Sequence, residues 1–240
     1  MLKYLLFVLP MIGFSQDAVR VEYEVQQEFD RSSIKKTSAK MEEMLNNSEN
    51  KRYYYELIVN DTNSNFTEIE RINNDQKGTI TSLGLSSNVS SNIYKEFNTK
   101  ELYENSKMKP KLFVKDSMQT FPWILTKEES TILGYKVRKA TYTNPTQTVE
   151  AWYAVDLPFR DGPSRYNGLP GLILKIKFKI PFTRDMDTNV SFTAIDIKPY
   201  KEKIELPNKA IKVTKEEYDN EMEKSKRKSG AVIYQGVEKD

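Results

Sequence analysis

Hydrophobic and polar residues alternate along much of this chain, and the clearest run lies in its second half. From position 172 to 180 every even residue is apolar, and lysines occupy positions 175, 177 and 179. Successive side chains of a β-strand point to opposite faces, so this alternation predicts a strand with one buried and one solvated face. The same pattern predicts strands at residues 19–29, 53–59, 66–72, 135–142, 148–154 and 190–197.

Helical patterns are scarce, and the best one begins at Thr214. Glu217 stands three residues later, which makes a capping box, and residues 224–228 hold several basic side chains that suit the end of a helix. Gly230 then supplies a stop. A second short helix is predicted at residues 38–46.

These elements predict a single, mainly β domain over residues 16–240. Turn residues such as Asn60-Asp61 and Asn144-Pro145 separate the strands. One solvated face per strand is typical of an antiparallel sheet. We therefore expect one antiparallel, strongly curved sheet, or a partly open barrel, with one or two flanking helices.

The composition excludes several classes of function. The chain has no His and no Cys, so it cannot hold a Ser-His-Asp triad, a Cys-His pair or an ordinary zinc site. Its 37 basic and 34 acidic residues are interspersed and leave a net charge of +3, which predicts no nucleic-acid partner. We expect no cofactor and no metal.

Carboxylates keep one kind of catalysis open. Asp156, Asp161 and Asp185 lie beside turns, and a pair of acids can perform glycoside hydrolysis. Acids beside turns are more often solvated or capping. The run Asp-Met-Asp-Thr-Asn at 185–189 is similar to the start of a calcium loop, but Val190 stands where that loop needs Gly, so calcium binding is not expected.

The segment at residues 151–173 carries the most distinctive motifs of the chain. It ends in Gly-Leu-Pro-Gly-Leu-Ile at 168–173, preceded by Ala-Trp-Tyr at 151–153 and Gly-Pro at 162–163. Further upstream stand Trp-Ile at 123–124 and Ile-Leu-Gly-Tyr at 132–135. On these motifs the chain resembles the GLPGLI family.

This resemblance implies an exported protein of the Gram-negative cell envelope. Members of the family have no agreed biochemical activity, and some are encoded beside outer-membrane TonB-dependent receptors. Many members carry Cys two residues after the Gly-Tyr pair, where this chain has Val137. A thiol function at that position therefore does not apply here.

The hexapeptide and its flanks are also the candidate binding site. Glycine admits positive φ and Pro170 fixes its own φ, which predicts a tight loop pinned to the core by Leu169 and Leu172. Binding residues concentrate on loops held by a rigid scaffold, although an architectural corner without chemistry is the alternative. Arg160 and Arg165 flank the Gly-Pro turn at 162–163, and their guanidinium groups can bind a carboxylate or phosphate. The candidate binding residues are Gly168, Leu169, Pro170, Gly171, Leu172, Ile173, Trp152, Arg160 and Arg165.

Two functional classes are thus open. The first is a non-enzymatic periplasmic protein that binds an apolar ligand, such as a lipid, or assists an outer-membrane transporter or receptor of the TonB-dependent kind. The second is a carboxylate-dependent hydrolase of the envelope. A binding protein needs an apolar cavity or patch, whereas the hydrolase needs two acids that converge in a cleft.

The first residues predict export. Lys3 precedes an apolar run at residues 5–14, and Gly13 and Ser15 place small residues before a cut, which is the pattern of a signal peptide over residues 1–15. The run is shorter than the ~20 residues that a membrane-spanning helix needs. Without Cys there is no lipid-modified anchor, so we expect the mature chain in the periplasm.

The intact mass of the protein made in its own cells tests this expectation. Signal peptidase cuts after a small residue, so the mass should correspond to the loss of about 15 or 16 residues. A full-length chain in the membrane fraction would contradict export.

Overall fold

The computed structural model describes residues 18–32, 38–69, 92–106, 112–145, 147–183, 186–206 and 211–224. Strands make up most of this part, which confirms a mainly β fold. They are β1 (Ala18–Asp30), β2 (Tyr53–Asn60), β3 (Asn63–Ile69), β4 (Asn92–Glu96), β5 (Glu101–Asn105), β6 (Leu112–Ser117), β7 (Ile124–Ile132), β8 (Tyr135–Asn144), β9 (Gln147–Ala154), β10 (Leu172–Thr183), β11 (Met186–Pro199) and β12 (Ile211–Thr214). The predicted signal peptide and Gly230 lie outside the described residues.

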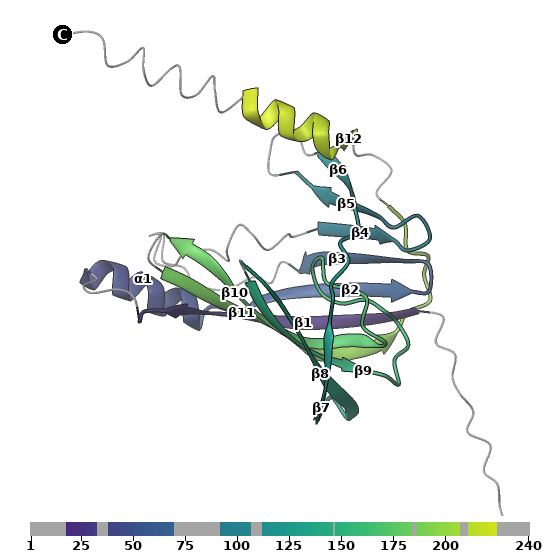
Figure 1. Cartoon of the computed structure of the whole chain (residues 1–240), viewed down its shortest axis with the longest axis horizontal. Coiled ribbons are helices and arrows are strands. Elements are labelled where there is room, and N and C mark those ends of the chain that lie inside the picture. The colour runs from purple at the N-terminus through teal and green to yellow at the C-terminus, as the bar shows by residue number, and fades with distance from the viewer. Residues whose placement is uncertain are drawn as a thin grey trace, which may run out of the picture.

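All of these strands belong to one sheet. Their order is β12-β6-β5-β4-β3-β2-β1-β11-β10-β9-β8-β7. Neighbouring strands are antiparallel, except that β12 pairs with β6 in parallel. The strands turn progressively along the sheet, so that β7 and β8 run across the direction of β2 and β3 (Figure 1). The sheet is therefore strongly curved and open, and it does not close into a barrel.

Alternation along the strands sorts the side chains as the sequence predicts. In β10 the side chains of Leu174, Ile176 and Phe178 are buried, whereas Lys177 is exposed. In β1 Val19, Val21, Tyr23 and Val25 are buried in the same way. We call the face that carries these apolar side chains the inner face of the sheet, and the opposite face the outer face.

Two helices flank the sheet. Helix α1 (Ala39–Asn50) begins at Ser38, whose hydroxyl accepts a hydrogen bond from the Met41 N–H. Its Leu45 packs into a small cluster with Phe29 and Met186. The second helix occupies residues 215–224, and Thr214 and Glu217 form the predicted capping box.

Several of the observed strands were not predicted from the sequence. Strands β4, β5, β6, β7 and β12 were not predicted, because they are short or lack a clean alternation. In β7, for example, almost every side chain is exposed, since this strand lies at the edge of the sheet. The predicted strand at 66–72 is observed to Ile69, and residues 70–91 lie outside the described part.

The inner face is closed by the chain itself. A protein that binds an apolar ligand needs an apolar cavity or patch, but on the inner face Ile176 and its neighbours belong to one continuous core cluster. Leu157, Phe159, Tyr166 and Leu169 of the β9–β10 connection are part of that cluster. The connection fills the concavity, because a sheet this curved would otherwise expose its apolar face to water. Among the described residues, no helix combines the length and apolar character needed to cross a membrane.

Glycines allow the connection to lie close to the strands. Gly168 has φ +93°, in the left-handed region that favours glycine. Gly171 does not have a positive φ, contrary to our expectation. A Cβ there would lie 2.2 Å from the carbonyl oxygen of Ala154, so a close approach to β9 requires glycine at this position.

Replacement of Gly171 should therefore destabilise the fold. We expect Gly171→Val to lower the free energy of unfolding by about 1–3 kcal/mol or more, because the backbone of β9 must move away. The control is Lys177→Ala on the outer face of the adjoining strand, which should stay within about 0.5 kcal/mol. Equal urea midpoints for the two variants would show that the approach to Ala154 is not tight.

Candidate functional site

The connection between β9 and β10, residues 155–171, holds most of the predicted binding residues. It folds back on itself through an isolated bridge between Asp161 and Asn167. The Gly168 N–H donates to the carbonyl of Arg160 at 2.9 Å, and the Ile173 N–H donates to that of Asp161 at 3.0 Å. These bonds make the connection a compact unit, which we call the hexapeptide loop.

A buried ion pair joins the hexapeptide loop to the far half of the sheet. Lys95 of β4 and Asp161 of the loop are both 0% exposed, with Lys95 Nζ 2.6 Å from Asp161 Oδ1. The Lys95 ammonium also donates to the carbonyls of Gly162 and Tyr166, at 3.1 and 3.3 Å. All three of its N–H groups therefore end on the loop.

Burial shapes the electrostatics around this pair. Loss of water lowers the pKa of the Lys95 ammonium, and the charge of Asp161 opposes that shift. The nearby Tyr23 hydroxyl donates to the carbonyl of Ile173 at 2.6 Å. Burial, with a smaller contribution from Asp161, raises the pKa of Tyr23 well above its ordinary value, so this phenol stays a donor.

Aromatic side chains hold the other side of the loop. The indole N–H of Trp123 donates to the carbonyl of Asn167 at 2.8 Å. Tyr166 lies with its ring centroid 5.2 Å from that of Phe121 and 5.3 Å from that of Phe178. Tyr166 is thus part of the core cluster, and Trp123 packs against that cluster.

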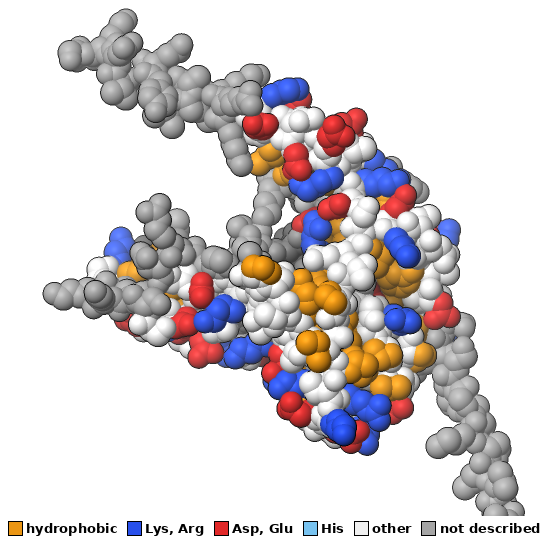
Figure 2. All heavy atoms as spheres, in the orientation of Figure 1, with side chains coloured by type: hydrophobic (Ala, Val, Ile, Leu, Met, Phe, Trp, Pro, Cys, Tyr) orange, Lys and Arg blue, Asp and Glu red, His pale blue; other side chains and the backbone are white. Residues whose placement is uncertain are grey.

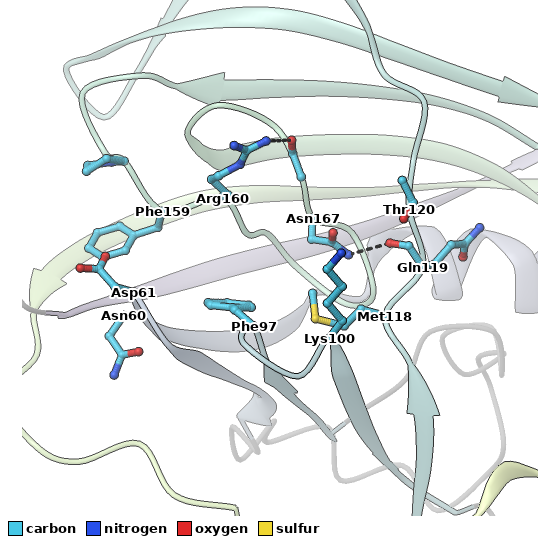
Figure 3. A pocket seen from close by; sticks show the side chains of 12 residues that line it. Asn60, Asp61, Phe97, Lys100, Met118, Gln119, Thr120, Phe159, Arg160 and Asn167 are labelled. Atoms are coloured by element: carbon cyan, nitrogen blue, oxygen red, sulfur yellow. Dashed lines mark hydrogen bonds between the residues drawn. The ribbon is translucent and has the colours of Figure 1, made fainter.

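A pocket opens where the hexapeptide loop reaches the surface (Figure 3). Its volume is about 460 Å³. The rest of the lining comes from the β2–β3 turn, the β4–β5 turn and residues 118–120, and the loop contributes Pro158, Phe159, Arg160, Asn167 and Gly168. Four short connections, far apart in sequence, thus meet at one site.

The pocket combines an apolar lining with two cations. Phe97, Met118 and Pro158 supply apolar surface, and Lys100 and Arg160 supply positive charge. In Figure 3 the side chain of Lys100 runs toward Asn167. Asp61 also lines the pocket, beside Phe159, and leaves a net positive charge.

Lys100 adopts an unfavourable backbone conformation at this site. Its φ is +56°, which costs a residue with a Cβ about 1 kcal/mol or more. The Met118 N–H donates to its carbonyl at 2.8 Å and holds the turn in place. Such strain is found where the surrounding structure over-determines a side chain, often at functional sites.

The structure places the predicted binding residues in different environments. Gly168 and Arg160 line the pocket, and an Arg160 N–H donates to the carbonyl of Gly168 at 3.2 Å. Leu169, Leu172 and Ile173 are buried in the core, while Pro170 is exposed and Gly171 lies against Ala154.

Arg165 and Trp152 lie away from this pocket. Arg165 forms ion pairs with Glu104 and Asp116, which occupy its guanidinium. Trp152 lies on the outer face, where its indole N–H donates to Glu150 at 3.1 Å.

The acids do not form the predicted hydrolytic pair within the described residues. Asp161 is buried against Lys95, whereas Asp156 is exposed, and Asp185 lies outside the described part. Lys95 and Lys100 were not predicted as site residues. A single lysine in a short strand or turn carries no local signal that it will be buried or strained.

Known proteins are similar to this chain in one short segment of sequence and in overall fold. Residues 144–175, from the end of β8 through the hexapeptide loop into β10, match a family described as "Protein of unknown function (Porph_ging)". No curated protein sequence matches this chain.

Two structures of PNGF-II are similar in fold. The structure in space group P21 is 17% identical in sequence, with a TM-score of 0.53. The alignment covers 85% of this chain and 32% of the PNGF-II chain. The one in space group C2 is 19% identical with a TM-score of 0.50, over 82% and 31%. This chain therefore spans about a third of the length of these proteins.

A structure of the LolA superfamily protein NE2245 from Nitrosomonas europaea also aligns with this chain. It is 12% identical with a TM-score of 0.29, over 82% of this chain and 90% of its own.

Removal of Lys95 tests the ion pair. Lys95→Met leaves Asp161 buried without its cation, so we expect the free energy of unfolding to fall by about 3–5 kcal/mol. The double variant Lys95→Met/Asp161→Asn removes the unpaired charge and should recover part of that loss. Urea unfolding measures both, with Lys127→Met on exposed β7 as the control. A loss below about 1 kcal/mol for Lys95→Met would show that the pair does not hold the loop.

Proposed function

We propose that this chain acts by binding an amphipathic anion, in which an apolar body carries a carboxylate or phosphate group, at the pocket beside the hexapeptide loop. One observation carries the proposal: Lys100 and Arg160 flank an apolar lining in a cavity of about 460 Å³. Apolar lining with a few placed polar groups is the usual composition of a small-molecule site.

The charge of the pocket supports an anionic headgroup. Neither Lys100 nor Arg160 forms an ion pair with any residue that the structure describes. Arg160 bonds to a backbone carbonyl, which orients its guanidinium and leaves other N–H groups for a ligand. A charge-assisted hydrogen bond is stronger than a neutral one.

The apolar body has to lie at the rim of the domain rather than deep inside it. The inner face of the sheet is packed against the hexapeptide loop, so it offers no site for an acyl chain there. Phe97, Met118 and Pro158 remain as apolar contacts at the pocket. A ligand held at this pocket would be partly exposed to solvent, which suits a protein that receives its ligand and passes it on.

The biological setting extends this proposal. The complete hexapeptide lies within the segment that matches the family model, which supports the resemblance to the GLPGLI family. We therefore propose an exported accessory protein of the periplasm that presents its ligand to an outer-membrane receptor of the TonB-dependent kind. The burial of Asp161 against Lys95 tells against its use as the catalytic acid of a hydrolase.

Calorimetric titration of the mature protein tests the site. Dodecanoate and dodecyl phosphate are the charged probes, and monododecanoylglycerol is the uncharged one. We expect the charged probes to bind more tightly than the uncharged one. Lys100→Gln and Arg160→Gln should each weaken the affinity for the charged probes about tenfold. Lys127→Gln on β7 is the matched control and should leave the affinity unchanged.

Three results would contradict the proposal. One is equal affinity for the charged and uncharged probes, and another is binding that survives both substitutions. The third is a hydrolytic activity that disappears in Asp156→Asn or Asp161→Asn, because a binding protein has no use for a catalytic carboxylate.

A further inference from the structure

A second hollow lies on the outer face of the sheet. It consists of two adjoining cavities of about 520 and 320 Å³, which share Lys177 and Asn189. One extends to the β8–β9 turn at Asn144, and the other to Glu49 of α1. Together they form a groove that runs across the strands, and we call it the outer groove.

Strand register aligns the side chains of the outer groove. Gln26 of β1 is opposite Ser191 of β11, Ser191 is opposite Lys177 of β10, and Lys177 is opposite Glu150 of β9. Cross-strand partners on one face lie about 5 Å apart. Hydrogen-bonding groups therefore follow one another at regular spacing across four neighbouring strands.

The charges along the outer groove nearly cancel. Its lining contains Lys175, Lys177 and Lys179, and also four acids: Glu28, Glu49, Glu150 and Asp187. Lys179 already pairs with Asp30 at 2.8 Å and with Asp187 at 3.6 Å. A polyanion or a polycation would meet like charges along this path, and neither is favoured.

Uncommitted polar groups fill the centre of the outer groove. Lys177, Asn189 and Ser191 form no side-chain hydrogen bond or ion pair with any residue that the structure describes. They offer both donors and acceptors, in contrast to the apolar and cationic pocket at the loop. Such a row matches a ligand whose hydroxyl groups also donate and accept along its length.

We propose that the outer groove binds a neutral, hydroxyl-rich chain, such as a strand of uncharged glycan. The regular row of polar side chains sets the direction of the chain across the sheet. The outer groove lies on the face opposite the core and shares no lining residue with the loop pocket, so the two sites are independent.

Titration of the mature protein with neutral oligosaccharides tests this proposal. The probes are maltohexaose, cellohexaose and chitohexaose, measured by calorimetry. We expect at least one to bind, and the double variant Lys177→Ala/Asn189→Ala to weaken it about tenfold or more. These two side chains form no hydrogen bond or ion pair with the residues that the structure describes, so the variant should unfold at nearly the same urea concentration as the original protein.

A fluorescence measurement locates the bound probe. The chain has two tryptophans, and Trp152 bonds to Glu150 in the lining of the outer groove. In a Trp123→Phe variant the remaining emission comes from Trp152, and we expect the bound probe to change it. Arg160→Gln, which tests the loop pocket, should leave oligosaccharide binding unaltered.

Several outcomes would overturn the inference. Absence of binding by all three oligosaccharides at millimolar concentration is one, and unchanged affinity in the double variant is another. Binding of phosphatidylglycerol vesicles that disappears in the double variant would show that the lysines recognise an anionic surface instead. Failure of dodecanoate to bind would affect only the loop pocket.

Discussion

The buried ion pair between Lys95 and Asp161 is the constraint on which the arrangement of this protein depends. Removal of two charges from water is costly, and hydrogen bonds to the buried groups offset part of that cost. Here the three N–H groups of Lys95 reach one carboxylate and two carbonyls, all in the hexapeptide loop. A shifted loop would leave a buried cation without partners. The pair thus selects one position for the loop across the inner face.

The position of the loop determines where binding chemistry can lie. A curved sheet with one apolar face could hold a ligand inside its curve, but here Leu157, Tyr166 and Leu169 occupy that space. The pocket that we propose as the binding site consequently lies at the edge of the loop, and Arg160 and the strained Lys100 both line it. Figure 2 shows hydrophobic side chains at the surface in the middle of the view, and charged side chains at the tip of the β7–β8 hairpin.

The two faces of the sheet differ in chemical character because side chains alternate along each strand. Because successive side chains alternate between faces, one strand such as β10 supplies Ile176 to the core and Lys177 to the outer groove. The inner face is closed by the loop, and the outer face stays polar and open to solvent. A similar fold covers about a third of the longer PNGF-II chain.

The fold class follows from local pattern alone, because alternation of apolar and polar residues has the period of a β-strand. The sequence located β1, β2, β8, β9, β10 and β11 and the starts of both helices, where the signal is local. It also placed Arg160 and Gly168 in a candidate site through the hexapeptide. Only the tertiary structure decided that Lys95 is buried, that Arg165 is paired with acids, and that the loop fills the inner face. The contacts of Lys95 alone join residues up to 71 positions apart, and no local pattern encodes the energies of such contacts.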